Sequence, residues 1–305
     1  MNKIIMIIHE VFMLYRKVNL IKDQYNKLNL KNKIKVSFEF FPPKNTIIDS
    51  LFINSIRQLK NFSPDFFSVT HSVNTQNKKD TSIVAQEIRR IAKNIPVAPH
   101  LTSIGYTDLD LKNIAEKYWE NGIRNIVALR GDFPFKYQGP KIYAVDLIKQ
   151  LKNVANFKIF VAAYPEIHPE SINLKNDLMN LKNKMNAGAE HAITQFFFDV
   201  EKFLRFRDNC YKNNINIDII PGILPILDIQ QLEKFSKMTN VYVPKYILKN
   251  FHKHIKNNKK CNTMSINIAV NIILKLYKEG IKKFHIYTLN RSELSSGICQ
   301  CLGLL

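Results

Sequence analysis

The sequence predicts an α/β fold, a single (β/α)8 barrel of the TIM type. Short runs rich in Val, Ile and Phe recur along the chain, and each is followed by a longer segment whose apolar residues have helical spacing. Eight such pairs follow one another, which favours a closed barrel over an open doubly wound sheet. No Ser-, Pro- or Gly-rich linker divides the 305 residues, and 46% of them are hydrophobic, enough for one large core.

The eight predicted strands are short and rich in β-branched and aromatic residues, and they lie at 35–41, 66–70, 96–101, 124–129, 158–163, 191–197, 217–224 and 283–288. The predicted helices lie between them, at 46–60, 78–93, 107–121, 141–155, 170–187, 199–213, 228–238 and 263–280, with a last helix after Arg291. We expect residues 1–34 to form an N-terminal extension and 35–305 to form the barrel domain. The Lys- and Asn-rich stretch 249–262 is the segment expected to be a mobile loop.

Composition narrows the class of protein. The formal charge of +20 would favour a polyanionic partner, but lysine is abundant everywhere, arginine is scarce, and aromatic-plus-basic stacking platforms are missing. We therefore expect no specific nucleic-acid partner. No stretch approaches the ~18 to 20 uninterrupted apolar residues that span a bilayer. The apolar stretch near the N-terminus is interrupted by His9 and Glu10 and lacks a small-residue cleavage site, so a cytoplasmic, non-membrane protein is expected.

The cysteines and the known short motifs exclude several kinds of site. Cys210, Cys261, Cys299 and Cys301 are too few and too unevenly spaced for a disulfide framework or a paired CxxC site, which predicts reduced thiols. Neither HExxH nor another metal-ligand spacing occurs, so no metal is expected. Because GxGxxG and P-loop patterns are also missing, a nucleotide cofactor would have to be held by barrel loops.

Polar residues follow the predicted strands, at the end of the barrel where such folds carry their chemistry. They are Glu39, Thr70, His71, His100, Arg130, Gly131, Asp132, Tyr164, Gln195, Asn290 and Arg291. Glu39 stands among three phenylalanines; an apolar environment favours a neutral carboxyl group, which makes Glu39 a candidate general acid. The alternative is an outward-facing glutamate paired with a lysine.

Other strand-end residues also allow two interpretations. Arg130, Gly131 and Asp132 offer a phosphate-binding guanidinium, a close backbone approach and a carboxylate for a cationic ligand, or else a turn held by a salt bridge. His100 is a ligand contact or a core histidine, whereas the Pro-bounded loop around His168 favours ligand contact. Gln195 could cap a strand or present its amide to a heterocycle.

The strings VSFEFFPP, APHLT, NIVALRGD, VAAYPEIHPE, AITQFFFDVEKFLRFRD, IIPGILPI and FHIYTLNR resemble bacterial methylenetetrahydrofolate reductase in order and spacing, from about residue 35 to the end. The resemblance implies a cytoplasmic barrel enzyme with noncovalent FAD. Such an enzyme takes a hydride from NADH and delivers it to 5,10-methylenetetrahydrofolate in a ping-pong reaction, giving 5-methyltetrahydrofolate for methionine synthesis. The resemblance also implies a homo-oligomer, a tetramer.

The resemblance implies a role for each matching residue. Glu39 matches the catalytic acid and Asp132 the carboxylate near flavin and folate. The flavin-contacting positions are Thr70, His71, His100, Arg130, Gly131, Asp132, Tyr143, Ala144, Tyr164, His168, Asp177 and Lys184. The folate-contacting positions are Asp132, Gln195, Gln231, Phe235 and Arg291, and those for NADH are Thr70, Gln195 and Phe235. Where the family often has an aromatic-glycine pair, this chain has His71 and Ser72. Phe235 could equally be a core residue by its helical spacing.

Three alternatives stay open at this point. A Schiff-base aldolase would share the fold, although no predicted strand end presents a lysine. A basic binding protein for RNA or anionic surfaces would lack a yellow cofactor. A decayed enzyme would keep these residues without activity, and NADPH could replace NADH.

Overall fold

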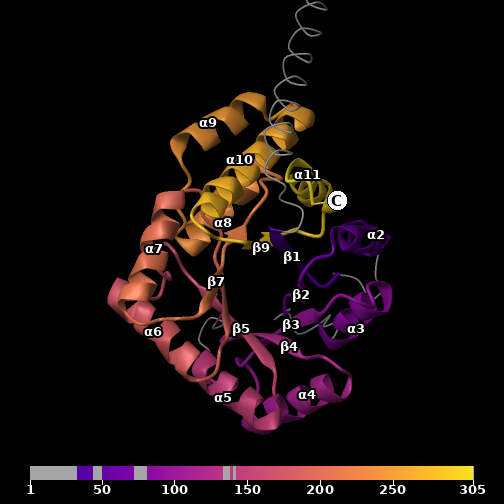
Figure 1. Cartoon of the computed structure of the whole chain (residues 1–305), viewed down its shortest axis with the longest axis vertical. Helices are drawn as coiled ribbons and strands as arrows, with labels where there is room; N and C mark the ends of the chain where they lie inside the picture. The colour runs from indigo at the N-terminus through magenta and orange to yellow at the C-terminus, as the bar shows by residue number, and fades with distance from the viewer. Residues whose placement is uncertain (1–32, 44–49, 72–80, 133–137, 140–141, 305) are drawn as a thin grey trace, which may run out of the picture.

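Parallel strands follow one another around a barrel, with helices around the outside (Figure 1). The structure is a computed structural model that describes residues 33–43, 50–71, 81–132, 138–139 and 142–304. Its strands are β1 (Lys35–Phe40), β2 (Phe67–Val69), β3 (Val97–Thr102), β4 (Asn125–Leu129), β5 (Lys158–Ala163), β6 (His191–Thr194), β7 (Asp218–Ile220), β8 (Gly222–Ile223) and β9 (Lys283–Tyr287). Every strand pairing within these ranges is parallel.

The barrel closes through a strand that is interrupted at one residue. Only Pro221 separates β7, which pairs with β6, from β8, which pairs with β9. Proline lacks an N–H group, so the ladder is broken there, yet the Pro221 carbonyl still accepts a hydrogen bond of 2.9 Å from the His285 N–H. The predicted strand 217–224 is therefore the two pieces β7 and β8, and the predicted eight-stranded barrel is confirmed.

The helices cover the outside of the strands (Figure 1). They are α2 (Ser50–Leu59), α3 (Thr81–Ile91), α4 (Asp108–Glu120), α5 (Ala144–Val154), α6 (Leu174–Asn186), α7 (Val200–Lys212), α8 (Ile229–Thr239), α9 (Lys245–His254), α10 (Asn258–Lys278) and α11 (Ser292–Cys301), and a 3-10 turn, Lys60–Phe62, follows α2. No helix in the described ranges has an apolar stretch long enough to cross a membrane.

Alternation along β1 separates two cores. Phe38 and Phe40 are fully buried toward the surrounding helices, where the Phe40 ring meets Phe52 of α2 at 5.5 Å. Successive side chains of a strand point to opposite faces, so Ser37 and Glu39 point into the barrel. A small apolar cluster from several strands fills the barrel interior, namely Phe66, Ala98, Val127, Phe160, Ile193 and Ile220.

The expectation of a mobile loop at 249–262 was wrong. The stretch forms the end of α9 and the beginning of α10. Ile247 and Phe251, four residues apart on α9, are 1% and 2% exposed, and a buried apolar stripe of this spacing stabilises a helix whose other face is rich in lysine. Lysine is itself a good helix former. The interpretation gave too much weight to charge and asparagine content and too little to apolar spacing.

Two other boundaries moved by a few residues. Helix α6 begins at Leu174 and not at 170, because Asn173 is its N-cap and accepts a hydrogen bond of 2.9 Å from the Asn176 N–H. Strand β6 ends at Thr194. The predicted extension 1–34 lies outside the described residues apart from 33 and 34, as do parts of the predicted helices at 46–60, 78–93 and 141–155.

A charged cluster lies at the strand starts, the end of the barrel opposite the predicted site. His191 Nδ1 and Lys283 Nζ each lie 2.7 Å from Asp218 Oδ2. The hydrogen bond from His191 is the largest cause that lowers the pKa of the Asp218 carboxyl to about 2, against the opposing effect of burial. This cluster ties β6, β7 and β9 together, and residues at this end of such barrels serve stability.

We expect Asp218 to contribute to stability in acid. Its folded-state pKa is below its unfolded value of roughly 4, so its contribution is complete above pH ~4 and is lost as the pH falls toward about 2. In urea unfolding at a series of pH values, the wild-type free energy of unfolding should fall more steeply across this window than that of Asp218→Asn. Asp208→Asn, on the exposed surface of α7, is the control. Parallel pH curves for wild type and Asp218→Asn would remove this role.

Candidate active site

A cavity of about 1080 Å³ opens at the C-terminal ends of the strands. Its walls come from β1, β3, β4, β5, β6 and β9, from residues that follow strands, such as Thr70 after β2 and Leu224 after β8, and from helices α5, α6 and α8. The structure brings together at this cavity every predicted site residue except two: Glu39, Thr70, His71, His100, Arg130, Gly131, Asp132, Tyr143, Ala144, Tyr164, His168, Asp177, Lys184, Gln195 and Phe235. The exceptions, Gln231 and Arg291, are exposed and do not line the cavity.

Glu39 lies between two histidines inside the barrel. Its Oε2 is 3.4 Å from His100 Nε2 of β3 and 3.5 Å from His285 Nε2 of β9, and its side chain is 13% exposed. The outward-facing alternative is therefore wrong. The reason offered from sequence was also wrong, because neighbouring residues of a strand face opposite sides. Phe38 and Phe40 pack outside the barrel, and imidazole rings border the carboxylate.

His285 is held by two hydroxyl groups. Ser37 Oγ lies 2.7 Å from His285 Nδ1, and Ser68 Oγ lies 3.4 Å from His285 Nε2. The ring also stacks on Phe66 at 5.5 Å and is fully buried. These contacts fix the orientation of the imidazole, so the position of its Nε2 beside Glu39 is determined by β1, β2 and β9 together.

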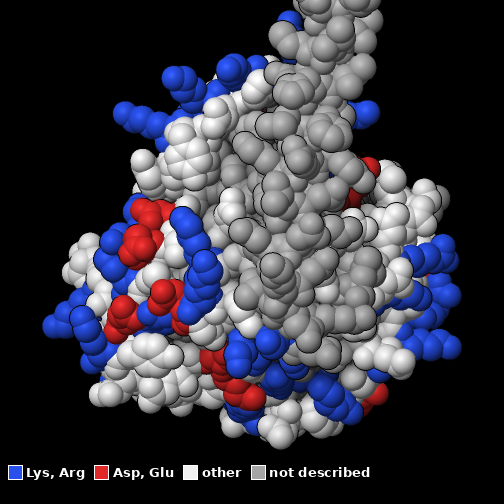
Figure 2. All heavy atoms as spheres, turned by 45° about the horizontal axis from the view of Figure 1, so that its top comes forward, with Lys and Arg blue, Asp and Glu red and all other residues white. Residues whose placement is uncertain are grey.

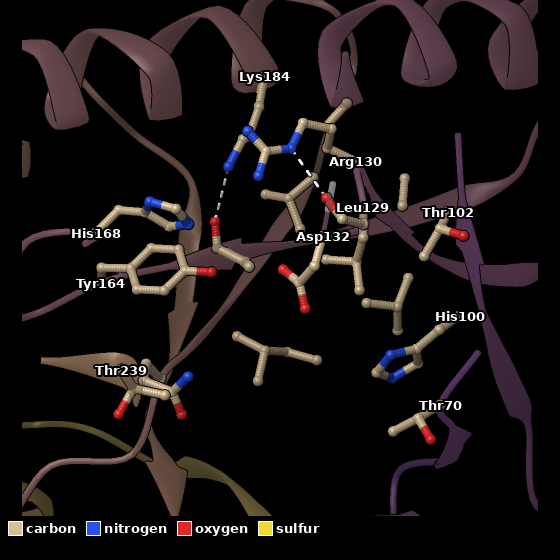
Figure 3. Close-up of a pocket in the computed structure, with 18 of the residues that line it drawn as sticks. Thr70, His100, Thr102, Leu129, Arg130, Asp132, Tyr164, His168, Lys184 and Thr239 are labelled. Carbon is tan, nitrogen blue, oxygen red and sulfur yellow. Dashed lines mark hydrogen bonds between the residues drawn. The ribbon is translucent and has the colours of Figure 1, made fainter. Parts of the chain in front are cut away.

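His100 and Thr102 present buried polar atoms to the cavity. Burial is the largest cause that lowers the pKa of His100 to about 4, so its ring is neutral near pH 7 and forms no ion pair with Glu39 there. Within the described residues, His100 Nε2 and Thr102 Oγ1 have no hydrogen-bond partner. Unsatisfied buried polar atoms are uncommon and mark places where a ligand or water completes the site. Figure 3 shows both side chains on the same side of the cavity.

The loop after β4 supplies a cation, a glycine and a carboxylate. Both terminal nitrogens of Arg130 donate to Glu170, at 2.6 and 2.9 Å, and this hydrogen-bonded pair raises the pKa of Arg130. The salt-bridge alternative is thus partly right, but the partner is Glu170 of another loop and not Asp132. Asp132 points into the cavity between Tyr164 and His100 (Figure 3).

Gly131 is required by its conformation and by its neighbours. Its φ of +87° lies in the left-handed region, which side chains rarely adopt. A Cβ atom there would stand 2.5 Å from Ile104 Cγ2 and 3.1 Å from Thr102 Cβ. The backbone therefore approaches the end of β3 as closely as only glycine permits.

The loop between β5 and α6 forms the opposite wall. The rings of Tyr164 and His168 meet edge to face at 4.5 Å. Burial is the largest cause that raises the pKa of Tyr164 to about 12 and lowers that of His168, so both rings are neutral near pH 7. Asp177 accepts hydrogen bonds from the His168 N–H and the Ser171 hydroxyl, each at 3.1 Å, and thereby ties this loop to α6.

One face of α6 continues this wall. Lys184 Nζ donates to the Ala162 carbonyl at 3.0 Å, as the dashed line in Figure 3 shows, and burial lowers the pKa of its ammonium group. Asn180 and Asn183 line the cavity between Asp177 and Lys184. Sequence reasoning missed these two asparagines, although Asn180 lies three residues after Asp177 and Asn183 three residues after Asn180, so neighbouring positions on α6 lead from one to the next.

The remaining wall comes from β6, α8 and β9. Gln195 Oε1 accepts a hydrogen bond of 3.0 Å from the Phe196 N–H, which leaves its NH₂ group as the donor for a ligand. Phe235 both lines the cavity and packs against the core, so its interpretation as a core residue is confirmed and its stacking on a substrate stays a prediction. Tyr287 was not predicted; its hydroxyl crosses to the Thr194 carbonyl at 2.7 Å.

His71 is occupied by two polar neighbours. Its Nδ1 lies 3.5 Å from Thr81 Oγ1 and its Nε2 lies 3.3 Å from Tyr106 Oη. The residue thus takes part in the wall near β2 where the family pattern often has an aromatic residue. Within the described ranges, no group of three or more His, Cys, Asp or Glu side chains could hold a metal ion, and the four cysteines form no disulfide.

This constellation defines a class of protein: a (β/α)8 barrel enzyme with a carboxylic acid in its mouth and a long polar cavity for a large ligand. The family model described as methylenetetrahydrofolate reductase matches residues 24–303. The chain therefore belongs to the methylenetetrahydrofolate reductase family, and it is an oxidoreductase.

Individual relatives of the chain also carry the name of this family. The 5,10-methylenetetrahydrofolate reductase of Buchnera aphidicola subsp. Schizaphis graminum is 52% identical over 276 residues, which cover 90% of this chain and 94% of that protein. The Escherichia coli K12 protein of the same name is 46% identical over 275 residues, covering 90% and 93%. A solved structure, described as an uncharacterized protein from Clostridium thermocellum that binds two copies of 5-methyl-5,6,7,8-tetrahydrofolic acid, has a TM-score of 0.61 at 16% identity, over 91% of this chain and 98% of that one. It shows the fold alone.

Proposed function

We propose that the chain reduces 5,10-methylenetetrahydrofolate to 5-methyltetrahydrofolate with a hydride from NADH. The hydride would pass through noncovalent FAD in a ping-pong reaction. The product would supply methyl groups for methionine synthesis. The observation that carries this proposal is the placement of Glu39. The carboxyl group of Glu39 lines a cavity of about 1080 Å³ and lies beside two histidines. Family membership supports the same conclusion.

FAD fits the residues that are present. In the described wall, His100 Nε2 and Thr102 Oγ1 are buried polar atoms that make no hydrogen bond, and a heterocycle with ring nitrogens and carbonyl oxygens could satisfy them. The glycine at 131 leaves room for a backbone approach that a Cβ would fill. When bound, FAD would accept and donate the hydride, which no side chain can do. The residues proposed to hold it are Thr70, His71, His100, Arg130, Gly131, Asp132, Tyr143, Ala144, Tyr164, His168, Asp177 and Lys184.

The side chains supply proton transfer and electrostatics. Glu39 would donate a proton to the folate nitrogen that departs when the methylene bridge opens. This opening creates a cation on the folate, and the carboxylate of Asp132, which points into the same space, would stabilise it. The Gln195 NH₂ group would orient folate and, in the other half-reaction, the nicotinamide. Phe235 would stack on either substrate, and Thr70 would also contact NADH. Gln231 and Arg291 would contact the outer part of folate.

The proposal is tested by the bound cofactor and the product. The purified protein should carry FAD that denaturation releases, and it should convert methylenetetrahydrofolate to 5-methyltetrahydrofolate while oxidising an equal amount of NADH. Parallel assays with NADPH decide the electron donor. Folded protein that binds no added FAD, or that oxidises NADH without forming the methylated product, would overturn the proposal.

Asp132→Asn should separate cation stabilisation from cofactor binding. Removal of the negative charge disfavours the folate cation, so folate turnover should fall, while an electron-rich reduced flavin becomes easier to form. Stopped-flow folate reduction and a redox titration of the bound flavin measure the two effects. Asp208→Asn, which lies on the exposed surface of α7 and does not line the cavity, is the control that removes the same charge. An unchanged or lower flavin potential in Asp132→Asn would exclude the electrostatic role.

Partners and location are part of the same proposal. We propose a cytoplasmic homo-oligomer, a tetramer by the resemblance, which sedimentation analysis tests. We propose no nucleic-acid role: on the face shown in Figure 2, basic side chains stand in several separate places with acidic ones beside some of them, and they form no continuous stripe. Sequence-selective binding of nucleic acid that persists at ~0.2 M salt would contradict this expectation.

A further inference from the structure

The turn after β9 has an unusual backbone. Leu289 and Asn290 have φ values of 51° and 60°, two consecutive non-glycine residues in the left-handed region. Asparagine tolerates this region, whereas a leucine there is an outlier of the kind that persists only when its surroundings impose it. Leu289 lines the cavity. Contacts with neighbouring residues therefore hold the turn in this conformation.

The turn is hydrogen-bonded to the end of β1. Strands β1 and β9 lie side by side (Figure 1), and their last paired residues are Glu39 and Tyr287. Beyond that pair, the Thr288 N–H and the Thr288 hydroxyl both donate to the Glu39 carbonyl, at 3.2 and 2.6 Å. The Asn290 N–H donates to Thr288 Oγ1 at 3.1 Å, so the threonine hydroxyl links the turn to the strand.

The Asn290 side chain extends this attachment by two residues. Its Oδ1 accepts from the Phe41 N–H at 2.8 Å and its Nδ2 donates to the Phe41 carbonyl at 2.9 Å. The amide thus imitates a neighbouring strand, pairing with both backbone groups of one residue. The Asn290 carbonyl in turn accepts from Ser55 Oγ of α2 at 3.1 Å. The backbone from Glu39 to Phe41 is consequently held by the turn that follows β9.

These contacts affect the position of the Glu39 carboxyl group. Glu39 Oε2 lies 3.5 Å from His285 Nε2, and His285 belongs to β9, which ends at Tyr287, directly before the turn that carries Thr288 and Asn290. β9 and the turn after it therefore contribute both to the position of the Glu39 backbone and to that of the His285 imidazole. We propose that Thr288 and Asn290 are positioning residues for Glu39 in the folate half-reaction; this inference rests on the function proposed above.

The competing explanation is that Thr288 and Asn290 serve only to close the barrel. Rates of the two half-reactions distinguish this structural role from positioning of Glu39. Proton donation by Glu39 is needed only when folate is reduced, so a displaced Glu39 should slow that step alone. Loss of barrel closure would instead reduce flavin content and both steps together. A misplacement of about 1 Å can cost ~10²-fold in rate, which makes even a small shift of β1 measurable.

Three variants isolate the contacts. Asn290→Gly removes the amide while glycine keeps the left-handed backbone without strain. Thr288→Val removes the hydroxyl with little change of shape, and Thr288→Ser keeps it. We expect Asn290→Gly and Thr288→Val to slow flavin reoxidation by methylenetetrahydrofolate at least ~10-fold, with flavin content and reduction by NADH close to wild type. Thr288→Ser should restore reoxidation.

The outcomes separate the explanations. Wild-type reoxidation in Asn290→Gly and Thr288→Val, or an equal loss of flavin content and both half-reactions, would overturn the proposal. If the wild-type protein is not reoxidised by methylenetetrahydrofolate, the proposed function fails. A crystal structure of Asn290→Gly then still decides the positioning role: it should show the Glu39 carboxylate displaced from His100 and His285, and an unmoved carboxylate would contradict it.

Discussion

Glu39→Gln is expected to slow reduction of methylenetetrahydrofolate by at least the ~10²- to 10⁴-fold that general-acid catalysis contributes, while reduction of the flavin by NADH stays near the wild-type rate. Glutamine keeps the size of glutamate and can still meet His100 and His285, but it has no proton to give. Hydride transfer from NADH needs alignment and no acid. The two half-reactions should therefore respond differently to one substitution.

Stopped-flow measurement resolves both rates in the same preparation. Flavin reduction by NADH is followed first, and reoxidation by methylenetetrahydrofolate is followed after mixing without oxygen. Glu116→Gln, on the exposed surface of α4 beside Lys112, is the matched control. If reoxidation of Glu39→Gln stays near wild type, Glu39 is not the acid. If both steps collapse together, its contacts with His100 and His285 serve structure.

Gly131→Ala is expected to abolish cofactor retention in a protein that still folds. The left-handed backbone costs an alanine about 1–2 kcal/mol, and its Cβ would also meet Ile104 Cγ2 at 2.5 Å. The loop after β4 must then move away from β3, and this movement shifts Arg130 and Asp132. We expect FAD affinity to fall by at least ~10²-fold, because misplaced contacts lose both hydrogen bonding and alignment.

Gly280→Ala separates strain from displacement. Gly280 has the same φ of +87°, but an added Cβ there meets nothing within 4 Å. Both variants should therefore lose the stability that the left-handed backbone costs an alanine in thermal unfolding of the cofactor-free protein, and only Gly131→Ala should fail to bind FAD in a fluorescence titration. Equal FAD affinity in the two variants would mean that the loop accommodates the Cβ and that Gly131 is not part of the cofactor site.

The barrel could be predicted because its signals are local. Each strand has its own apolar run and each helix its own stripe, and eight repeats leave few other arrangements. Alternation within β1 was also available from sequence, and it shows that Phe38 and Phe40 cannot surround Glu39. Helix α9 was missed for the opposite reason: Ile247 and Phe251 give it a buried stripe, but lysine and asparagine content was taken as the signal of a loop.

The environment of Glu39 could not be predicted, because its neighbours come from distant parts of the chain. His285 is brought beside Glu39 only by closure of the barrel between β1 and β9, and His100 only by the position of β3 across the mouth. The contacts of Thr288 and Asn290 with β1 have the same origin, since they join residues whose numbers differ by 249. Strand-end positions indicate which polar residues share a cavity but not which atoms face each other.

The cofactor wall was predicted in part. Arg130, Gly131 and Asp132 follow β4 directly, and their place at the mouth follows from the fold. The partner of Arg130 did not follow: Glu170 stands in the loop after β5, forty residues further on. Gln231 and Arg291 share the C-terminal end of the barrel but do not line the cavity, so their proposed folate contacts depend on how far the substrate extends beyond it.

The most direct test of the account is an anaerobic single turnover with the purified wild-type protein. The account predicts a yellow, FAD-containing protein whose visible absorbance is bleached by one equivalent of NADH. Addition of methylenetetrahydrofolate should then restore the absorbance and form one equivalent of 5-methyltetrahydrofolate. A folded protein that takes up no FAD, or a bleached flavin that methylenetetrahydrofolate does not reoxidise, would contradict it.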